Sequence, residues 1–432
     1  MTVLTSAGVA DTDQRASATD RLLNLVTRYG LSAFGPIAVS GAHFVASIVF
    51  LHAFSRSDFG LFSFLLVIVP FCLSLNGALL GPSITSRDAK SGMTVAEDTG
   101  MHLKISLVFA LAASVAVFLL TLTIRAQPEL AAILGCYGGM MTLRWVGRCY
   151  AYRHHRPLRA VSSDFAYSAV VVVATVTLSM LHQLTAMYAA IILFGAAASG
   201  LIVFGRDYLA RQFWPGRDGS LRAYGLVWRD MTRWSLMGVA LTEITANAHA
   251  YLVTLISGPG AFALLAIGTL LMRPVSLVYA ALPDVERPAI ARAIAAGDHA
   301  RAFRIVKEFR TAVGAMWVAT VLAASTILIW FPHLVLKNGY GQGQALTVAA
   351  FFAAIMAVRA VRTPESVFLQ AAREYRPLAR ASLWSSLVSL VATLLLLLAA
   401  GPIASLGGIL AGEALMTVNI LALSRRWRAS HG

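Results

Sequence analysis

The sequence predicts an all-α polytopic membrane protein with about 12 transmembrane helices. Three observations support this fold class: the composition, the spacing of apolar segments, and the distribution of Lys and Arg. Of the 432 residues, 58% are hydrophobic and only 13% are charged, and the mean hydropathy is +0.72. A soluble globular chain carries about 25% charged residues. This chain therefore has too few charges to cover a surface in water.

Twelve apolar segments have about the length needed to cross a membrane. A hydrocarbon core about 30 Å thick requires about 20 helical residues. The segments are 32–52, 61–81, 103–125, 129–149, 161–182, 184–205, 234–256, 261–283, 311–331, 344–361, 380–400 and 404–424.

Lys and Arg gather on one side of these segments. With a cytoplasmic N-terminus, 31 of the 35 basic residues flank the cytoplasmic ends, whereas Arg56, Arg125 and Lys337 lie outside and Arg273 lies within a span. Basic loops stay in the cytoplasm, so both termini are predicted to be cytoplasmic. The net charge of +15 follows from this topology. It favours contact with anionic membrane lipids and not with nucleic acid, for which no motif is present.

The chain divides into two halves around its longest loop. Residues 1–31 are predicted to form a cytoplasmic tail, whose first 20 residues are polar, disordered and unlike a signal peptide. Residues 32–205 form an N-lobe with six spans, 206–233 a cytoplasmic amphipathic linker, 234–424 a C-lobe with six spans, and 425–432 a cytoplasmic tail. Any repeat between such halves is parallel. Similar Ser-led hairpins at Ser55 and Ser257 favour an internal duplication.

Four ionisable residues occur near the middle of predicted spans: His43, Glu243, Arg273 and Glu413. A charge at the bilayer centre costs at least about 2.5–3.5 kcal/mol on insertion scales. Their common depth predicts one polar chamber between the two lobes, where transporters place their sites. The alternatives are that Glu243 or Glu413 neutralises Arg273, and that His43 is a packed, hydrogen-bonded side chain.

The seventh predicted span is unusually polar, with T-E-I-T-A-N-A-H-A-Y-L-V at 242–253. A continuous helix places its residues on three faces: Glu243, Asn247 and Tyr251; Thr242, Thr245 and His249; and a lipid-facing stripe of Leu241, Ile244, Ala248 and Leu252. The polar faces require a protein interior or a water-filled cavity. The alternative for Asn247 is an interhelical hydrogen bond.

Basic residues near the inner ends of spans form a second group. Arg144 and Arg148, with Asp164, are expected to snorkel to the interface. Arg359 and Arg362 face the inner chamber, together with Glu365, if the tenth helix continues through Pro364 to about residue 371; otherwise they are loop charges. Together the four arginines could form an inner ring at the chamber entrance.

Motifs for enzymes, metal sites and resident cofactors are absent from the sequence. There is no Walker A motif and no H-E-x-x-H, and Cys72, Cys136 and Cys149 form no C-x-x-C pair. The longest predicted outside loop, 332–343, leaves little room for a glycosyltransferase or polymerase site. We therefore expect no enzyme, no metal and no cofactor.

Three stretches resemble the polysaccharide-transport branch of the multidrug/oligosaccharidyl-lipid/polysaccharide (MOP) flippases, the Wzx-type repeat-unit flippases. They are S-R-S-D-F-G-L-F-S-F at 55–64, L-I-S-G-P-G-A-F-A-L-L-A-I-G-T-L-L-M-R-P-V-S-L-V-Y-A-A-L-P at 255–283, and R-A-I-A-A-G-D-H-A-R-A-F-R-I-V-K at 292–307. Two features depart from relatives: His249 and Ala250 stand near where many carry an aspartate followed by arginine, and the chain lacks the extra helix pair of lipid II flippases.

The resemblance implies two six-helix lobes around a central cavity in the bacterial inner membrane. It implies flipping of a polyprenyl-diphosphate-linked oligosaccharide, with polysaccharide polymerase or export machinery as possible partners. Arg273 would hold the diphosphate, and Arg144, Arg148, Arg359 and Arg362 would form the entrance ring. The polar face of the seventh span would contact sugar hydroxyls, and Tyr137, Tyr167 and Tyr251 could stack on sugar rings.

The sequence is compatible with more than one driving ion and with more than one function. Glu243, Glu413 and His249 could titrate and couple transport to a proton gradient, and sodium is the other candidate ion. One alternative is a drug or metabolite exporter of the same fold, driven by H⁺ or Na⁺. Another is a non-transporting scaffold of a polysaccharide-synthesis complex, and a polymerase or glycosyltransferase is a third.

Overall fold

The computed structural model describes residues 18–85, 95–154, 156–214, 221, 224–336 and 340–431, and the regular structure within these ranges is entirely helical. The N-terminal half contains α1 (Ala18–Ala53), α2 (Arg56–Thr85), α3 (Val95–Arg125), α4 (Pro128–Arg153), α5 (Pro157–Met180), α6 (Ala186–Ile202) and α7 (Arg206–Phe213). The C-terminal half contains α8 (Tyr224–Val227), η2 (Trp228–Thr232), α9 (Arg233–Ala246), α10 (Ala248–Ser257), α11 (Pro259–Leu271), α12 (Arg273–Ala295), α13 (His299–Trp330), η3 (Pro332–Leu334), α14 (Gln342–Ala371), α15 (Tyr375–Ala400) and α16 (Ser405–His431).

Each of the twelve predicted spans corresponds to one helix or to a broken helix pair. Among the described residues, eight helices are long and apolar enough to cross a membrane, or up to 10 if each bent pair counts as one span. The bent pairs are α6 with α7, at 111°, and α11 with α12, at 62°. The other two predicted spans are α4, and α9 with α10, which are helical but do not meet the same criteria. The structure confirms the predicted fold class of a multi-pass helical membrane protein.

The helix ends differ from the sequence-based boundaries. The first helix begins at Ala18, so part of the predicted tail at 1–31 is helical, while residues 1–17 lie outside the described residues. At the other end, α16 continues to His431, so the predicted C-terminal tail is largely a helical extension of the last span. Hydropathy detects only the apolar part of a helix, whereas a helix can continue into a polar extension whose residues have adequate helix propensity.

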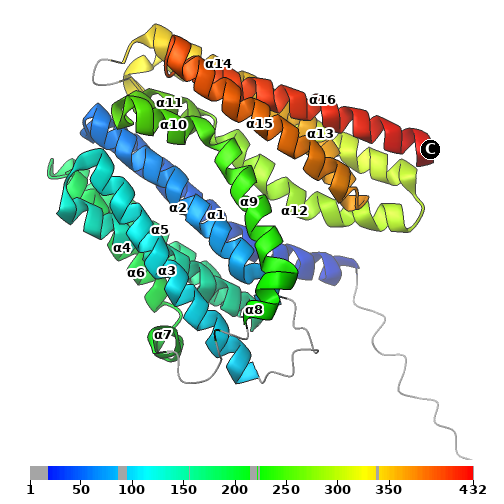
Figure 1. Cartoon of the computed structure of the whole chain (residues 1–432), viewed down its shortest axis with the longest axis horizontal. Helices are drawn as coiled ribbons and strands as arrows, with labels where there is room; N and C mark the ends of the chain where they lie inside the picture. Colours follow the sequence, from blue (N-terminus) through cyan, green and yellow to red (C-terminus); the bar gives the residue numbers. More distant parts are fainter. Residues whose placement is uncertain are drawn as a thin grey trace, which may run out of the picture.

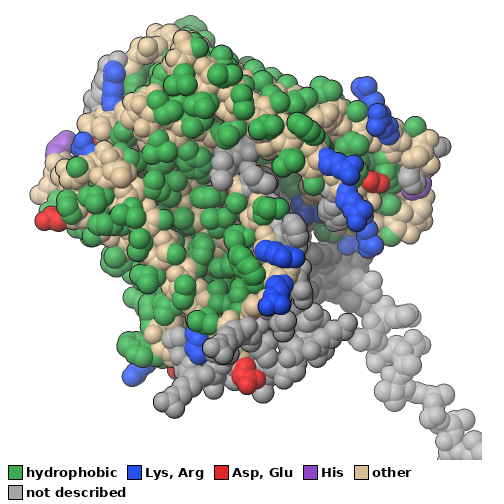
Figure 2. Space-filling model, viewed as in Figure 1, with side chains coloured by type: hydrophobic (Ala, Val, Ile, Leu, Met, Phe, Trp, Pro, Cys, Tyr) green, Lys and Arg blue, Asp and Glu red, His purple; other side chains and the backbone are tan. Residues whose placement is uncertain are grey.

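The helices form two bundles, α1–α6 and α9–α16 (Figure 1). The bundles meet near the α10–α11 hairpin and diverge toward their opposite ends, where α7 and α8 lie in one direction and the C-terminus in another. Hydrophobic side chains cover most of the visible surface (Figure 2). Large apolar side chains such as Leu111 and Leu398 are 67% and 65% exposed, as expected for surfaces that face lipid.

The two lobes share one apolar core at the end that the charge distribution predicts to be outside. The core joins Phe50, Phe62 and Phe64 of the N-lobe to Val253 and Phe262 of the C-lobe. The first hairpin of each half, at Ser55 and at Ser257, lies at this same end, where Gly60 packs against Pro259. Consequently packed side chains close this end of the molecule.

Candidate functional site

A cavity of about 180 Å³, here called the interlobe chamber, lies where the two lobes separate. Both lobes contribute to its wall. Its polar lining consists of Ser47, Ser63, Asn247, His249, Thr269, Arg273, Ser276 and Arg359. Phe59, Phe262 and Phe352 are among the apolar side chains that line it. The structure therefore brings three predicted site residues, Asn247, His249 and Arg273, together with Arg359.

Arg273 is the first residue of α12, directly after the break at Met272. Pro274 follows it, a residue that suits the first turn of a helix because it lacks an N–H group. Among the residues that the structure describes, no hydrogen bond or ion pair is formed by the Arg273 side chain. Its charge interacts with His43 and Tyr167 across the lobe boundary. A partly buried guanidinium with no counter-ion is costly, and a bound anion would compensate it.

Neither Glu243 nor Glu413 neutralises Arg273, so the alternative that one of them forms an ion pair with it is wrong. Glu413 of α16 binds Arg359 and Arg362 of α14, with Arg359 Nε 2.8 Å from Oε1 and Arg362 Nη2 3.1 Å from Oε2. Glu243 of α9 accepts hydrogen bonds from Ser74 Oγ at 2.7 Å and from Asn247 Nδ2 at 3.3 Å. Because Ser74 lies in α2, the Glu243 contact joins the two lobes.

A second cavity of about 360 Å³, here called the C-lobe cavity, adjoins the interlobe chamber. The two share the lining residues Ala246, Ser276, Met356, Arg359 and Ile409. Arg362, Glu413 and Tyr279 line the C-lobe cavity, and so does a serine face of α15 made of Ser382, Ser385, Ser386 and Ser389. The i, i+3, i+4, i+7 spacing of these serines places them on one face of a helix. The sequence analysis did not include them in the predicted site, although this spacing could have identified them.

Helix α14, which corresponds to the tenth predicted span, continues through Pro364. This is the first of the two alternatives given for Arg359 and Arg362. Both arginines consequently lie in a helix that lines the cavity. Glu365 does not line the cavity with these two arginines, so the prediction that it faces the chamber is wrong. It is 1% exposed and binds Arg310, Arg428 and Ser424. That cluster fastens the inner ends of α13, α14 and α16.

The seventh span is broken at Asn247, where α9 ends and α10 begins. The break changes the phase of the helix, so Ala248 is buried and does not face lipid as the continuous-helix prediction expected. Tyr251 packs against Phe64 and Phe71 with ring centroids 6.2 and 6.1 Å away. It does not line the interlobe chamber. The side chains of Leu241, Thr242, Ile244 and Thr245 lie outside the described residues.

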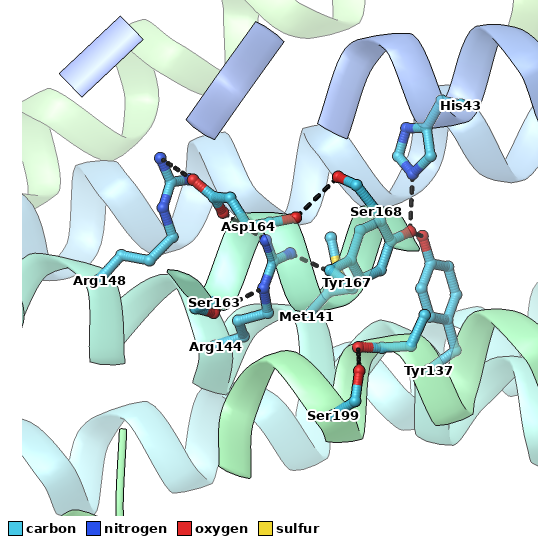
Figure 3. A network of polar contacts seen from close by, with 11 residues as sticks. His43, Tyr137, Met141, Arg144, Arg148, Ser163, Asp164, Tyr167, Ser168 and Ser199 are labelled. Atoms are coloured by element: carbon cyan, nitrogen blue, oxygen red, sulfur yellow. Dashed lines mark hydrogen bonds and ion pairs between the residues drawn. The ribbon is translucent and has the colours of Figure 1, made fainter. Parts of the chain in front are cut away.

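Figure 3 shows a separate polar network inside the N-lobe. His43 Nε2 is 2.7 Å from the Tyr167 hydroxyl, which is 3.1 Å from the Tyr137 hydroxyl. These contacts correspond to the packed, hydrogen-bonded alternative for His43. Tyr137 and Tyr167 are buried, so in this conformation neither ring is available for stacking on a sugar.

Arg144, Arg148 and Asp164 complete this network. Arg144 binds Asp164, Arg148 Nη2 lies 3.2 Å from Asp164 Oδ2, and the Arg144 guanidinium stacks over the Tyr167 ring at 4.5 Å. Arg144 is 3% exposed and Asp164 is fully buried, so the expectation that they snorkel is wrong. Gly35 permits the close approach of Asp164, because a β-carbon there would overlap the carboxylate.

The predicted entrance ring therefore divides between the lobes. Arg144 and Arg148 line a cavity of about 170 Å³ within the N-lobe, whereas Arg359 and Arg362 line the C-lobe cavity. These four arginines do not surround one opening in this conformation. Within the described part of the chain, no group of three or more His, Cys, Asp or Glu is arranged to hold a metal ion.

Known structures share this fold across nearly the whole chain. A multidrug resistance MATE-family transporter of the MOP superfamily, in an inward-facing conformation, has a TM-score of 0.64 at 14% identity, covering 91% of this chain and 95% of its own. The lipid II flippase MurJ, in an inward closed conformation, has a TM-score of 0.67 at 10% identity, covering 91% and 87%. A MOP transporter from Pyrococcus furiosus, described as having a binding pocket of reverse polarity, has a TM-score of 0.59 at 12% identity, covering 93% and 95%.

The comparisons establish the MOP transporter fold, and the resemblance drawn from the sequence is confirmed at that level. No protein-family model and no curated protein matches the sequence. At identities of 10–14% the likeness concerns the arrangement of helices. What the chain carries across the membrane must therefore come from its own side chains.

Proposed function

Because the chain has the fold of transporters that move substrates between two lobes, we propose that it is an inner-membrane flippase. It moves a polyprenyl-diphosphate-linked oligosaccharide repeat unit from the cytoplasmic to the periplasmic face, for surface polysaccharide biosynthesis. The observation that carries this proposal is Arg273, a guanidinium without a protein partner among the described residues, on the wall of the interlobe chamber.

A diphosphate supplies the anion that this site lacks. Guanidinium holds two phosphate oxygens at once, which makes arginine well suited to phosphate recognition. Arg273 also begins α12, so the positive end of that helix adds to its field. A cation would be repelled here by Arg273 and Arg359 together. The charge of the chamber therefore favours an anionic substrate.

The C-lobe cavity suits the glycan. Its serine face offers hydroxyl groups for hydrogen bonds with sugar hydroxyls, and the Tyr279 hydroxyl, which donates to the Met356 carbonyl, can still accept one. Because this cavity joins the interlobe chamber, one substrate can place its diphosphate at Arg273 and its sugars along α15. The polyprenyl chain would remain in lipid between the diverging lobes.

Alternating access follows from the two lobes and their contacts. Packed aromatic and aliphatic side chains close the predicted outer end. The bundles diverge at the other end (Figure 1). The breaks at Asn247 and Met272 give the seventh and eighth spans points at which they can bend. Transport requires the outer core to separate while the inner ends approach.

Coupling to an ion gradient is part of the proposal. Glu243 bridges the lobes through Ser74, and Glu413 lies between two arginines, so protonation of either would release contacts that hold this conformation. Sodium is the other candidate ion. If E243Q and E413Q proteins both transport normally across a pH series, coupling through these carboxylates is wrong.

A second candidate is a drug or metabolite exporter driven by H⁺ or Na⁺. The specific observation in its favour is that MATE-family transporters share the fold. A cation exporter needs acidic residues that are not neutralised by arginine. Glu413 is bound by two arginines, so Glu243, which is bound by Ser74 and Asn247, is the carboxylate that such an exporter would use. A non-transporting scaffold remains a third candidate, for which charge-neutral replacements in the chamber would be harmless.

The deciding experiment is lipid analysis of a deletion strain complemented with wild type, R273A, R273K or R292A. Arg292 is exposed at the inner end of the C-lobe and serves as a control. Completed lipid-linked repeat units should accumulate on the cytoplasmic face with the deletion and R273A, less with R273K, and not with R292A. If the repeat unit reaches the periplasmic face in the deletion strain, flipping is wrong. Unchanged glycans with new sensitivity to toxic cations would indicate the exporter.

A further inference from the structure

A further cavity of the N-lobe lies at its predicted cytoplasmic end, away from the interlobe chamber. Its volume is about 430 Å³, and it shares no lining residue with the interlobe chamber or the C-lobe cavity. The beginning of α3, the turn between α4 and α5, and the elbow between α6 and α7 enclose it. We call it the elbow cavity. Nothing in the proposed transport cycle uses it.

Three arginines line the elbow cavity, from three separate segments. Arg156 comes from the α4–α5 turn, Arg159 from α5 and Arg211 from α7. Within the described ranges none of them forms an ion pair, and Arg159 Nη1 donates only to the Phe204 carbonyl at 3.2 Å. Asp207 is the one acidic side chain in the lining. Three cations and one anion leave a formal charge of +2, which attracts a phosphate ester.

A buried hydroxyl with only a weak partner also belongs to this cavity. Tyr150 is 5% exposed, and its hydroxyl lies close to Thr99 without forming a well-oriented hydrogen bond to it. Most buried polar groups are hydrogen-bonded, and leaving one unpaired costs free energy. A ligand oxygen that accepts a hydrogen bond from Tyr150 would remove this cost.

The elbow is fixed in place by polar contacts of α7. Tyr208 donates to Gln212 Oε1 at 2.9 Å, and Gln212 Nε2 donates to Ser106 Oγ of α3 at 2.9 Å. Gln212 is fully buried. These bonds hold Arg211 at the cavity although it lies on a short helix. The backbone of the elbow is therefore in place before any ligand binds, while the three arginine side chains are exposed and can reach a ligand.

The position of the elbow cavity matches the headgroup layer. Because α7 turns by 111° from α6, it runs across the direction of the spans, and Trp214 directly after it is 81% exposed. Exposed tryptophan at a helix end is typical of the membrane–water interface. Leu158 precedes the lining residue Arg159 in the chain and Ile202 lies two residues before Phe204; they are 62% and 64% exposed, and offer apolar surface on which an acyl chain can lie.

We propose that the elbow cavity binds the phosphate of an anionic phospholipid of the cytoplasmic leaflet. Arg156, Arg159 and Arg211 contact the phosphate, Tyr150 donates a hydrogen bond to it, and the acyl chains lie against Leu158 and Ile202. Basic pockets between helices on this side of a membrane are known to take lipid headgroups. This inference does not depend on which substrate crosses the interlobe chamber.

The test uses the purified full-length protein in nanodiscs of phosphatidylcholine with a spin-labelled phosphatidylglycerol as the probe. The variant is R156Q/R159Q/R211Q, and the matched control is R292Q/R301Q/R304Q, which removes three exposed arginines from the inner end of the C-lobe. We expect a saturable site whose affinity falls about tenfold or more in the first variant and is unchanged in the control. Y150F should weaken binding by a smaller factor.

Three outcomes would overturn the proposal. An equal loss in both triple variants would show that the lipid responds to surface charge in general. An unchanged affinity in the elbow variant would show that these arginines do not bind it. Binding of inorganic phosphate, measured by calorimetry in lipid-free detergent, without a saturable phosphatidylglycerol site would assign the cavity to a soluble anion. Y150F keeps the test decisive if the triple variant does not fold.

Discussion

Gly60 of α2 packs directly against the backbone of Pro259 at the start of α11, so that a β-carbon at position 60 would overlap the Pro259 carbonyl oxygen. This contact joins corresponding hairpins of the two halves, after Ser55 and Ser257. Nearby, the Arg56 guanidinium lies over the Tyr340 ring, 4.7 Å from its centre. The outer closure of the molecule therefore depends on a glycine at which the two lobes touch.

Gly60→Ala should shift the molecule toward a form that is open at the outer end. The added methyl group must push the α11 backbone away, and backbone yields less easily than the end of a flexible side chain. A thiol placed in the outer core should become at least severalfold more reactive toward a membrane-impermeant reagent. Gly41→Ala in α1 is the control, because nothing lies within 4 Å of its β-carbon position. Equal reactivity in both variants would contradict the prediction.

Asp164→Asn should strongly destabilise the N-lobe. Two arginines then lose their shared counter-ion in a site where Asp164 is fully buried and Arg144 almost so. Removing one partner of a buried ion pair costs about 3–5 kcal/mol. Thermal unfolding in detergent, followed by loss of monodisperse protein, measures the effect. The double variant D164N/R144M should recover part of the loss, and failure to recover any would show that charge burial is not the cause.

Glu413→Gln should lower stability by a smaller amount, about 1–3 kcal/mol, because the Arg359, Arg362 and Glu413 side chains are partly exposed. It leaves two neighbouring guanidinium groups without their carboxylate. A double-mutant cycle with R362Q, measured by thermal unfolding, should give a coupling energy of about 0.5–3 kcal/mol. A coupling near zero would mean that the pair is not formed in the membrane.

Ser382→Ala with Ser386→Ala should impair recognition of the glycan without affecting the fold. Both side chains are partly exposed and line the C-lobe cavity, so their loss leaves no buried cavity in the protein. Flipping by reconstituted protein should show a KM raised about three- to tenfold, equivalent to one lost hydrogen bond. The control replaces Ser430, which lies at the C-terminal end of α16. An unchanged KM would remove the serine face from the substrate site.

Much of the fold could be predicted from local sequence. All twelve predicted spans correspond to helices or helix pairs, because hydrophobic segments of that length have few alternatives in lipid. From the sequence, the continuation of α14 through Pro364 was only one of two possibilities. Its outcome depends on neighbouring helices that accommodate the proline. Sidedness, inferred from the arginine distribution, remains a prediction.

The candidate site was predicted in part. Sequence placed His43, Glu243, Arg273 and Glu413 at one depth, and of these four only Arg273 lines the interlobe chamber, together with Asn247 and His249 from the polar faces of the seventh span. It did not assign the partners of Glu413, since Arg359 and Arg362 come from another helix and depth alone does not say which faces meet. It also missed the break at Asn247. A helical wheel for an unbroken α-helix predicts that Ala248 faces lipid, whereas Ala248 is buried.

The sequence by itself determined that this is a multi-pass membrane protein and predicted two sets of six spans, because apolar length and basic loops are local properties that can be compared with a bilayer of fixed thickness. Only the tertiary structure decided which charged side chains form ion pairs and which do not. Asp164 binds Arg144 and Glu413 binds Arg359, while Arg273 has no ion-pair partner in the described chain. The physical reason is that the electrostatic energy of a buried charge depends on distances between helices that are far apart in the chain.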